Sequence, residues 1–281
     1  MNDVLTEADL TAYLTRTGYR GALQPTLGAL SALVAAHNES IPFENLDPLF
    51  GVPVDDLGAA ALADKLVHRR RGGYCYEHNG LMGFVLERLG YAVDRLAGRV
   101  VWMSEPGSPL PALTHQVLSV AVPGVGGRYL VDVGFGGQTL TSPIRLAVDE
   151  VQQTRHEPYR LVRGEDGSAL HAQVRGQWQA LYEFTERPQS RIDLEVGSWY
   201  VSTHPSSPFV TGMTAALVTE DGRWNLRGRN LAIHRGGNTE KVRFDNAAQV
   251  VEALSRMFGI DLADVADADV VQARVAQVLD S

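Results

Sequence analysis

Cysteine is nearly missing from this sequence: Cys75 is the only one among 281 residues. No intramolecular disulfide can form, and a single free thiol is typical of a protein kept in a reducing compartment. No stretch approaches 18 consecutive apolar residues, so we expect no membrane-spanning helix and no membrane partner. The first ten residues include acids but no basic segment, so we expect no signal peptide and predict a cytoplasmic location.

Positive charge is also scarce, with 25 Lys and Arg against 33 Asp and Glu and a formal net charge of -8. A nucleic-acid-binding surface needs clustered basic side chains, and the only basic run, residues 68–71, is short. We therefore expect no nucleic-acid partner. The eight histidines are scattered and no phosphate-binding glycine loop occurs, so we also expect no metal site and no classical nucleotide motif.

The spacing of apolar residues divides the chain into three parts. Helical spacing dominates to about residue 90, with a capped start at Thr6 and Asp9 and a stop at Gly90. Strand-like segments follow at 92–102, 115–122 and 129–133, and a hairpin is predicted at Asp166-Gly167. This strand-rich region is predicted to run to about residue 200, and short strands and two helices come after it. We predict an α+β fold with domains 1–90, 91–200 and 201–281.

Cys75 lies where a glycine-rich break, residues 71–73, enters an apolar helix. A lone cysteine is most often just a small buried hydrophobe. Here, however, a helix N-terminus can stabilise a thiolate, and Arg71 is expected to add positive charge nearby. The thiolate is the nucleophilic form of the side chain, so this position favours a nucleophilic cysteine.

A cysteine nucleophile needs a histidine to take its proton and a third group to orient that histidine. His115 begins one predicted strand and Asp132 lies in the next, with a glycine-rich turn between them. If the strands pair as a hairpin, the two side chains can meet across the sheet. Asp132 could instead be a structural carboxylate, but a buried carboxylate demands a partner. We interpret His78 as a surface or core residue, because it is too close to Cys75 along the same helix.

These three residues and their neighbours resemble the Cys-His-Asp triad of the arylamine N-acetyltransferases. The motif Arg-Gly-Gly-x-Cys-x-Glu-x-Asn of that family is matched in full at residues 71–79. Segments 41–46, 114–115, 131–136 and 202–209 are also similar, and the resemblance covers nearly the whole chain. It implies an N-terminal helical bundle, a central antiparallel β-barrel and a C-terminal α/β lid, with a core like that of cysteine proteases and transglutaminases.

The resemblance also implies an activity, the acetyl-CoA-dependent N-acetylation of arylamines and arylhydrazines and the O-acetylation of N-arylhydroxylamines. In such a ping-pong reaction Cys75 carries the acetyl group, His115 acts as the base and Asp132 orients His115. Acetyl-CoA is then a co-substrate, and no cofactor is tightly bound. We expect a monomer or a weak homodimer.

Two sets of binding residues follow from the same resemblance. The expected arylamine pocket contains Phe43, Tyr76, Val100, Phe135 and Phe209, and the expected acetyl-CoA contacts are Thr114, Gly136 and His234. Each phenylalanine, taken singly, is more often a core residue.

Two other activities use the same triad. A related amide synthase closes macrolactam rings and takes its acyl group from a carrier protein. A hydrolase of the wider Cys-His-Asp superfamily would release the acid without an amine acceptor.

Overall fold

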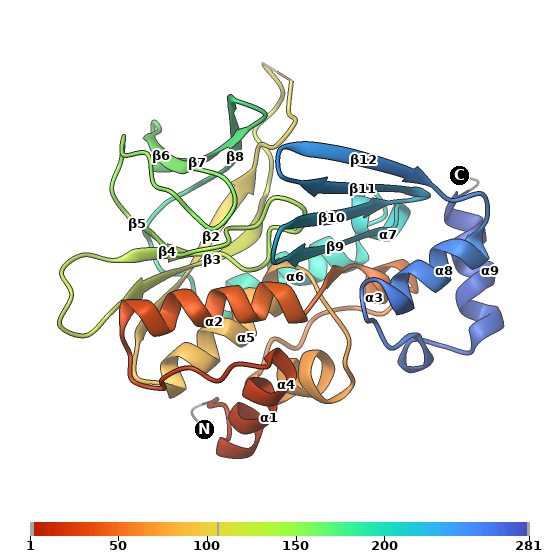
Figure 1. Ribbon diagram of the computed structural model, residues 1–281, viewed down its shortest axis with the longest axis horizontal. Helices are drawn as coiled ribbons and strands as arrows, with labels where there is room; N and C mark the ends of the chain where they lie inside the picture. Colours follow the sequence, from red (N-terminus) through yellow and green to blue (C-terminus); the bar gives the residue numbers. More distant parts are fainter. Residues whose placement is uncertain (1–2, 106, 280–281) are drawn as a thin grey trace.

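Two antiparallel sheets and the helices packed against them make up residues 3–105 and 107–279, the part of the chain that the computed structural model describes (Figure 1). This mixture of helices and antiparallel strands confirms the predicted α+β class. The predicted domains 1–90 and 201–281 include residues 1–2 and 280–281, which lie outside the described residues. The division of the chain at residues 90 and 200 stays a prediction.

The N-terminal helices form the layer that carries Cys75. They are α1 (Glu7–Thr17), α2 (Leu27–Ser40), α3 (Leu46–Leu49), α4 (Ala59–Ala63), which continues as a π-helical turn (Asp64–His68), and α5 (Cys75–Arg88). The predicted cap of the first helix is confirmed, because the backbone N–H of Asp9 donates to Thr6 Oγ1 at 3.1 Å. Gly90, with φ +93°, takes the left-handed conformation that ends α5.

The larger sheet curls into a nearly closed barrel. In sheet order its strands are β5 (Ile144–Arg145), β4 (Tyr129–Val131), β3 (Leu113–Ala121), β2 (Ala92–Val100), β8 (Gln177–Phe184), β7 (Ser168–Val174) and β6 (Tyr159–Arg163). Bridges from Val148 to Leu161 and from Gln152 to Tyr159 bring the chain after β5 against β6. The strands predicted at 92–102, 115–122 and 129–133 are β2, β3 and β4, and the predicted hairpin joins β6 to β7.

The smaller sheet takes one strand from the N-terminal part of the chain. Its strands are β1 (Phe43–Glu44), β9 (Thr214–Thr219), β10 (Gly222–Arg227), β11 (Asn230–Arg235) and β12 (Asn238–Arg243). β1 pairs with β9, with Phe43 opposite Ala216. Helices α8 (Ala247–Arg256) and α9 (Ala268–Leu279), joined through a 3-10 turn (Leu262–Asp264), lie at the end of this sheet (Figure 1). Residues 43–44 therefore add an N-terminal strand to the sheet that the C-terminal strands β9–β12 form.

One prediction about the barrel is wrong, namely that strands continue to about residue 200. The last barrel strand ends at Phe184, and helices α6 (Arg191–Thr203) and α7 (Pro208–Thr211) follow. The buried residues of α6 are Leu194, Ser198, Val201 and Ser202. Because two of these four are serines, the apolar repeat of the helix is too weak to be recognised from the sequence.

Helix α5 connects the helical layer with the barrel. Its residues from Cys75 to Leu86 are buried, and it contacts α4 as well as β2 and β3. On β3, Leu118 packs in the same core as Val85 of α5, whereas Val117 packs inside the barrel. β3 therefore presents one face to α5 and the other to the barrel interior, as expected for alternating side chains.

Candidate active site

Cys75 is the first residue of α5 and is 5% exposed. The helix starts there because Tyr74, the N-cap residue, is extended (φ -119°, ψ -168°), and its backbone N–H donates to Glu77 Oε2 at 3.0 Å. The thiol lies 3.6 Å from the carbonyl oxygen of Thr114 on β3. The buried thiol therefore faces the strand that carries His115.

The predicted contact between His115 and Asp132 is confirmed. His115 Nε2 lies 2.8 Å from Asp132 Oδ2, and both side chains are buried. Leu118 of β3 is opposite Val131 of β4, so His115 and Asp132 are diagonal neighbours just past the end of this ladder. Diagonal pairs lie within reach of long side chains, which explains why the two residues meet without being directly opposite.

Asn79 organises the site, although our sequence analysis assigned it no role beyond the motif. Its Nδ2 donates to Asp132 Oδ1 at 2.9 Å and to the Gln116 carbonyl oxygen at 2.7 Å, and its Oδ1 accepts from the Val133 backbone N–H at 3.0 Å. Asp132 Oδ1 also accepts from the Gly134 backbone N–H at 2.9 Å. One buried amide thus joins the nucleophile helix to both strands. In the sequence, the only indication of this role is that Asn79 belongs to the matched motif, four residues after Cys75.

Burial and charge act in opposite directions on the titratable groups of the site. Burial favours the neutral form of His115, but Asp132 and then Cys75 outweigh burial and raise the pKa of His115 to about 10. Burial likewise disfavours ionised Asp132, but His115, Asn79 and Gly134 lower the pKa of this carboxyl group. The site therefore holds the His115 ring between the Asp132 carboxylate and the Cys75 thiol, the order of groups that nucleophilic catalysis by a cysteine needs.

The loop after Asp132 passes directly over the start of α5. A Cβ atom placed on Gly134 would lie 2.7 Å from Cys75 Cα and 2.9 Å from Asn79 Nδ2, so only glycine allows this approach. Gly136, at φ +78°, lies against the ring of Phe43. The two glycines let the loop that follows β4 pack closely on Cys75 and Phe43.

Three of the residues expected in the arylamine pocket contact other aromatic rings at or beside the predicted site. The rings of Phe43 and Phe209 meet edge to face at a centroid distance of 5.9 Å, and Phe209 lies 5.4 Å from Tyr74. Phe135 lies 5.2 Å from the imidazole of His115. Aromatic walls of this kind suit a flat ring.

The other two residues expected in the arylamine pocket are Tyr76 and Val100. The Tyr76 side chain is buried, and its hydroxyl donates to the Leu113 carbonyl oxygen at 3.3 Å. Val100 is opposite Tyr182 in the β2–β8 pair, and the Tyr182 ring lies 4.7 Å from His115. Contacts of Tyr76 and Val100 with a substrate stay predictions.

The residues expected to contact acetyl-CoA are divided between the triad and the lid. Thr114 directly precedes His115, and Gly136 lies beside Phe43. His234 is on β11, where its Nδ1 is 2.9 Å from Thr239 Oγ1, and it faces Arg223 of β10 in the sheet. Their contacts with a nucleotide stay predictions.

The expected effect of Arg71 on the thiol is wrong. The guanidinium is buried and forms ion pairs with Glu44 Oε1 at 2.9 Å and Asp47 Oδ1 at 2.7 Å. Lys65 pairs with Asp47 and with Glu77 in the same cluster. Since a buried charge must be paired, Arg71 is neutralised by its carboxylates and serves to attach β1 and α3 to the start of α5.

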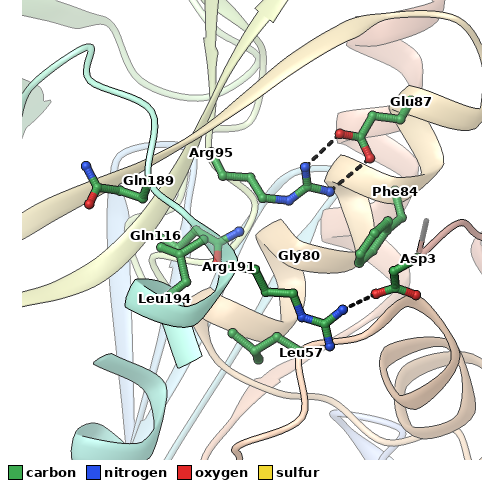
Figure 2. A pocket seen from close by; sticks show the side chains of 10 residues that line it. All are labelled: Asp3, Leu57, Gly80, Phe84, Glu87, Arg95, Gln116, Gln189, Arg191 and Leu194. Carbon is green, nitrogen blue, oxygen red and sulfur yellow. Dashed lines mark hydrogen bonds and ion pairs between the residues drawn. The ribbon is translucent and has the colours of Figure 1, made fainter. Parts of the chain in front are cut away.

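A cavity of about 290 Å³ lies beside α5 but contains none of the predicted site residues (Figure 2). Its wall includes Gly80 and Phe84 of α5 and two ion pairs, one between Arg95 and Glu87 and one between Arg191 and Asp3.

In residues 3–105 and 107–279, no three His, Cys, Asp or Glu side chains are grouped to hold a metal ion. No helix in those same residues is long and apolar enough to cross a membrane.

The chain matches a known protein family and known enzymes over most of its length. The family model described as "N-acetyltransferase" matches residues 26–267. The arylamine N-acetyltransferase of Mycolicibacterium smegmatis is 70% identical over 273 residues, which cover 97% of this chain and 99% of that protein. The Mycobacterium tuberculosis arylamine N-acetyltransferase is 61% identical, covering 96% of each chain.

Solved structures give the same result. The M. smegmatis arylamine N-acetyltransferase superposes with a TM-score of 0.94 at 70% identity, covering 97% of this chain and 99% of that one. The Mycobacterium marinum enzyme in complex with CoA superposes with a TM-score of 0.94 at 61% identity, covering 96% of this chain and 99% of that one. With its buried cysteine, histidine and aspartate at the junction of helical layer and barrel, this chain belongs to the arylamine N-acetyltransferase family.

Proposed function

We propose that this chain transfers an acetyl group from acetyl-CoA to arylamines and arylhydrazines, and to the oxygen of N-arylhydroxylamines, through an acetyl-Cys75 intermediate. The observation that carries the proposal is the 2.8 Å contact of His115 with buried Asp132 beside a cysteine at a helix start. The relatives that share this chain's length are named for the same activity, and one of them was solved with CoA.

In the first half-reaction, the Cys75 thiolate attacks the thioester carbonyl carbon of acetyl-CoA. The bond from Cys75 Sγ to the acetyl carbon forms, and the bond from that carbon to the CoA sulfur breaks. The His115 imidazolium gives its proton to the departing CoA thiolate. The raised pKa of His115 supports this role, because it keeps the ring protonated until the leaving group needs a proton.

In the second half-reaction, the amine nitrogen attacks the acetyl-cysteine. The neutral imidazole of His115 takes the amine proton, and the electron pair of the breaking carbon–sulfur bond returns to Cys75. Asp132 holds the ring through its 2.8 Å contact and stabilises the imidazolium that forms. An arylamine suits this step, because it is largely neutral at pH 7 and its ring can stack on aromatic walls.

Phe43, Phe135 and Phe209 are proposed as the main walls for the arylamine ring, with Tyr76 and Val100 at its edge. Thr114, Gly136 and His234 are proposed to contact acetyl-CoA. The contacts among the phenylalanines, His115 and Gly136 support a shared cleft at the triad. We also propose a cytoplasmic monomer or weak homodimer, which size-exclusion chromatography with light scattering would distinguish from a larger assembly.

Intact-protein mass spectrometry tests the proposal. Brief mixing with acetyl-CoA should add one acetyl group to Cys75, and adding aniline should remove it as acetanilide appears. Cys75→Ala should remain folded, take up no acetyl group and show no transfer. Turnover by Cys75→Ala would contradict the covalent mechanism. A folded protein that forms no adduct while Cys75 still reacts with a thiol reagent would indicate a different acyl donor.

A further inference from the structure

A chain of buried hydrogen bonds passes behind the proposed arylamine pocket. Tyr13 Oη of α1 lies 3.1 Å from His37 Nδ1 of α2, and His37 Nε2 lies 2.8 Å from His78 Nδ1 of α5. His78 Nε2 lies 3.2 Å from the carbonyl oxygen of Pro42. All three side chains are at most 1% exposed. None of them takes part in the proposed transfer, so this relay needs a separate explanation.

The partners assign the proton on each ring. The Pro42 carbonyl can only accept, so neutral His78 carries its hydrogen on Nε2 and leaves Nδ1 as an acceptor. His37 must then donate from Nε2, which leaves its Nδ1 to accept from the Tyr13 hydroxyl. Burial lowers the pKa of both histidines, which supports the neutral forms. The hydrogen bonds of the relay therefore all run in one direction, from Tyr13 to Pro42.

The relay ends at the residue that precedes Phe43. His78 binds the Pro42 carbonyl, and its ring stacks on the Phe43 ring at a centroid distance of 6.3 Å and an interplanar angle of 14°. On the other side, the Glu44 backbone N–H donates to the Gly73 carbonyl oxygen at 2.8 Å. β1 is only two residues long, so few backbone hydrogen bonds to β9 hold it. His78 thus adds both a hydrogen bond and a ring contact at Phe43.

We infer that His78 is a positioning residue for the arylamine: as the end of the Tyr13–His37–His78 relay, it holds Phe43 in the wall that the acceptor ring contacts. This inference rests on the proposed function, because it concerns the second half-reaction only. It predicts that His78 affects arylamine use and leaves acetylation of Cys75 by acetyl-CoA nearly unchanged.

The test measures the two half-reactions separately in the full-length protein. His78→Met, which fills the space but cannot donate to Pro42, should reduce kcat/KM for aniline about tenfold, the effect of roughly one lost buried hydrogen bond. The rate of acetyl-Cys75 formation, measured by mass spectrometry without amine, should change less than about twofold. His78→Gln can donate from Nε2 to Pro42 and accept from His37, so it should restore most of the aniline activity.

Tyr91→Phe is the matched control. Tyr91 is also buried and donates to a backbone carbonyl oxygen, that of Thr26, at 2.8 Å, but it lies at the far end of α5. This variant should have a lower Tm and normal rates in both half-reactions. If His78→Met slows Cys75 acetylation as much as it slows aniline use, or if His78→Gln restores nothing, His78 has only a structural role and the inference is wrong.

A measurement on the unaltered protein keeps the inference testable if His78→Met does not fold. Histidine-selective ¹⁵N NMR at pH 7 should show Nε2–H forms for both His37 and His78. An Nδ1–H form of His78 would overturn the relay. Absence of any acetyl-Cys75 in the wild type is a distinct outcome, which contradicts the proposed function and not the relay.

Discussion

Asp132 is held by three hydrogen bonds, from His115, from the side chain of Asn79 on α5 and from the Gly134 backbone N–H. At the scale of single residues, the carboxylate does two things. It accepts hydrogen bonds that order the loop, and its negative charge keeps His115 protonated. A substitution that preserves shape but removes the charge separates these roles.

Asp132→Asn should reduce transfer on the order of a thousandfold, because the amide cannot stabilise the imidazolium and favours the wrong tautomer of His115. The measurement is the rate of acetyl-Cys75 formation, with circular dichroism to show that the variant is folded. Thr15→Ala, which removes an exposed hydroxyl of α1 that donates to the Thr11 carbonyl oxygen at 2.9 Å, serves as the control and should keep its activity. A rate above a tenth of the wild-type value in folded Asp132→Asn would contradict the assigned role.

The raised pKa of His115 predicts how stability depends on alkaline pH. The pKa is about 10 in the folded protein and about 6.5 in an unfolded chain. The stabilisation from protonated His115 is therefore complete below about pH 6.5 and is lost as the pH rises through about 10. Urea unfolding at several pH values should show the stability difference between wild type and His115→Gln decreasing over this range. A difference that is constant with pH would contradict the imidazolium assignment.

At the scale of elements, the site depends on how closely the loop after β4 approaches the start of α5. The contact is between main chains, so neither partner can move without shifting its whole element. The same α5 receives the relay from α1 and α2 through His78. Both contacts place the nucleophile helix relative to its neighbours.

Gly134→Ala should disrupt the approach of the loop to α5. The added Cβ would lie 2.7 Å from Cys75 Cα, and we expect a loss of about 1–3 kcal/mol in the free energy of unfolding and at least a tenfold loss of transfer. Gly126→Ala in the β3–β4 turn is the matched control, because nothing lies within 4 Å of its Cβ position. Its stability should change by less than about 0.5 kcal/mol. Equal behaviour of the two variants would show that the close approach is unimportant.

The relay predicts a loss of stability in acid. Burial lowers the pKa of His78 to about 4; Pro42 and Glu44 oppose this effect, and Lys65 adds to it. Burial also lowers the pKa of His37, and His78 and Arg16 add to that effect. Because an unfolded histidine titrates near 6.5, the stability present above that pH is lost as the pH falls toward 4. His78→Gln should lose less stability than wild type between these values in urea unfolding. Parallel curves would exclude a neutral buried His78.

At the scale of the whole molecule, one buried ion cluster joins the N-terminal layer to the lid. Arg71 pairs with Glu44 of β1 and Asp47 of α3, and it lies 3.5 Å from Asp264 near the C-terminal helices. β1 itself is a strand of the lid sheet. The arginine of the matched motif is thus a connection between parts of the chain that are distant in sequence.

Arg71→Met should lower the free energy of unfolding by about 3–5 kcal/mol, because it leaves the buried Glu44 carboxylate and the partly buried Asp47 carboxylate without their arginine partner. Arg69→Ala removes a more exposed arginine that pairs with Asp64 and Asp264, and it should cost no more than about 1 kcal/mol. Urea unfolding of both variants checks this. Similar losses would mean that the cluster contributes no more than a surface ion pair.

Local patterns were enough to predict much of this molecule. The cap at Thr6, the stop at Gly90, the strands that became β2, β3 and β4 and the β6–β7 hairpin depend on residues close together in the chain. The meeting of His115 and Asp132 was also predictable, because only a short turn separates their strands. Each of these features is governed by backbone preferences and spacing that a few neighbouring residues determine.

Other features were decided only by the tertiary structure. Helix α6 buries serines because Ser198 finds Tyr74 and Val54 as hydrogen-bond partners across the fold. Asn79 organises the site, Arg71 is neutralised, and His78 ends a relay, each through partners that lie far away in the sequence. A buried polar group must be satisfied wherever a partner is brought near it, and that partner is set by packing of the whole chain. The sequence by itself therefore determined most of the helices and strands and the meeting of His115 with Asp132, and the tertiary contacts decided helix α6 and what each buried polar side chain does.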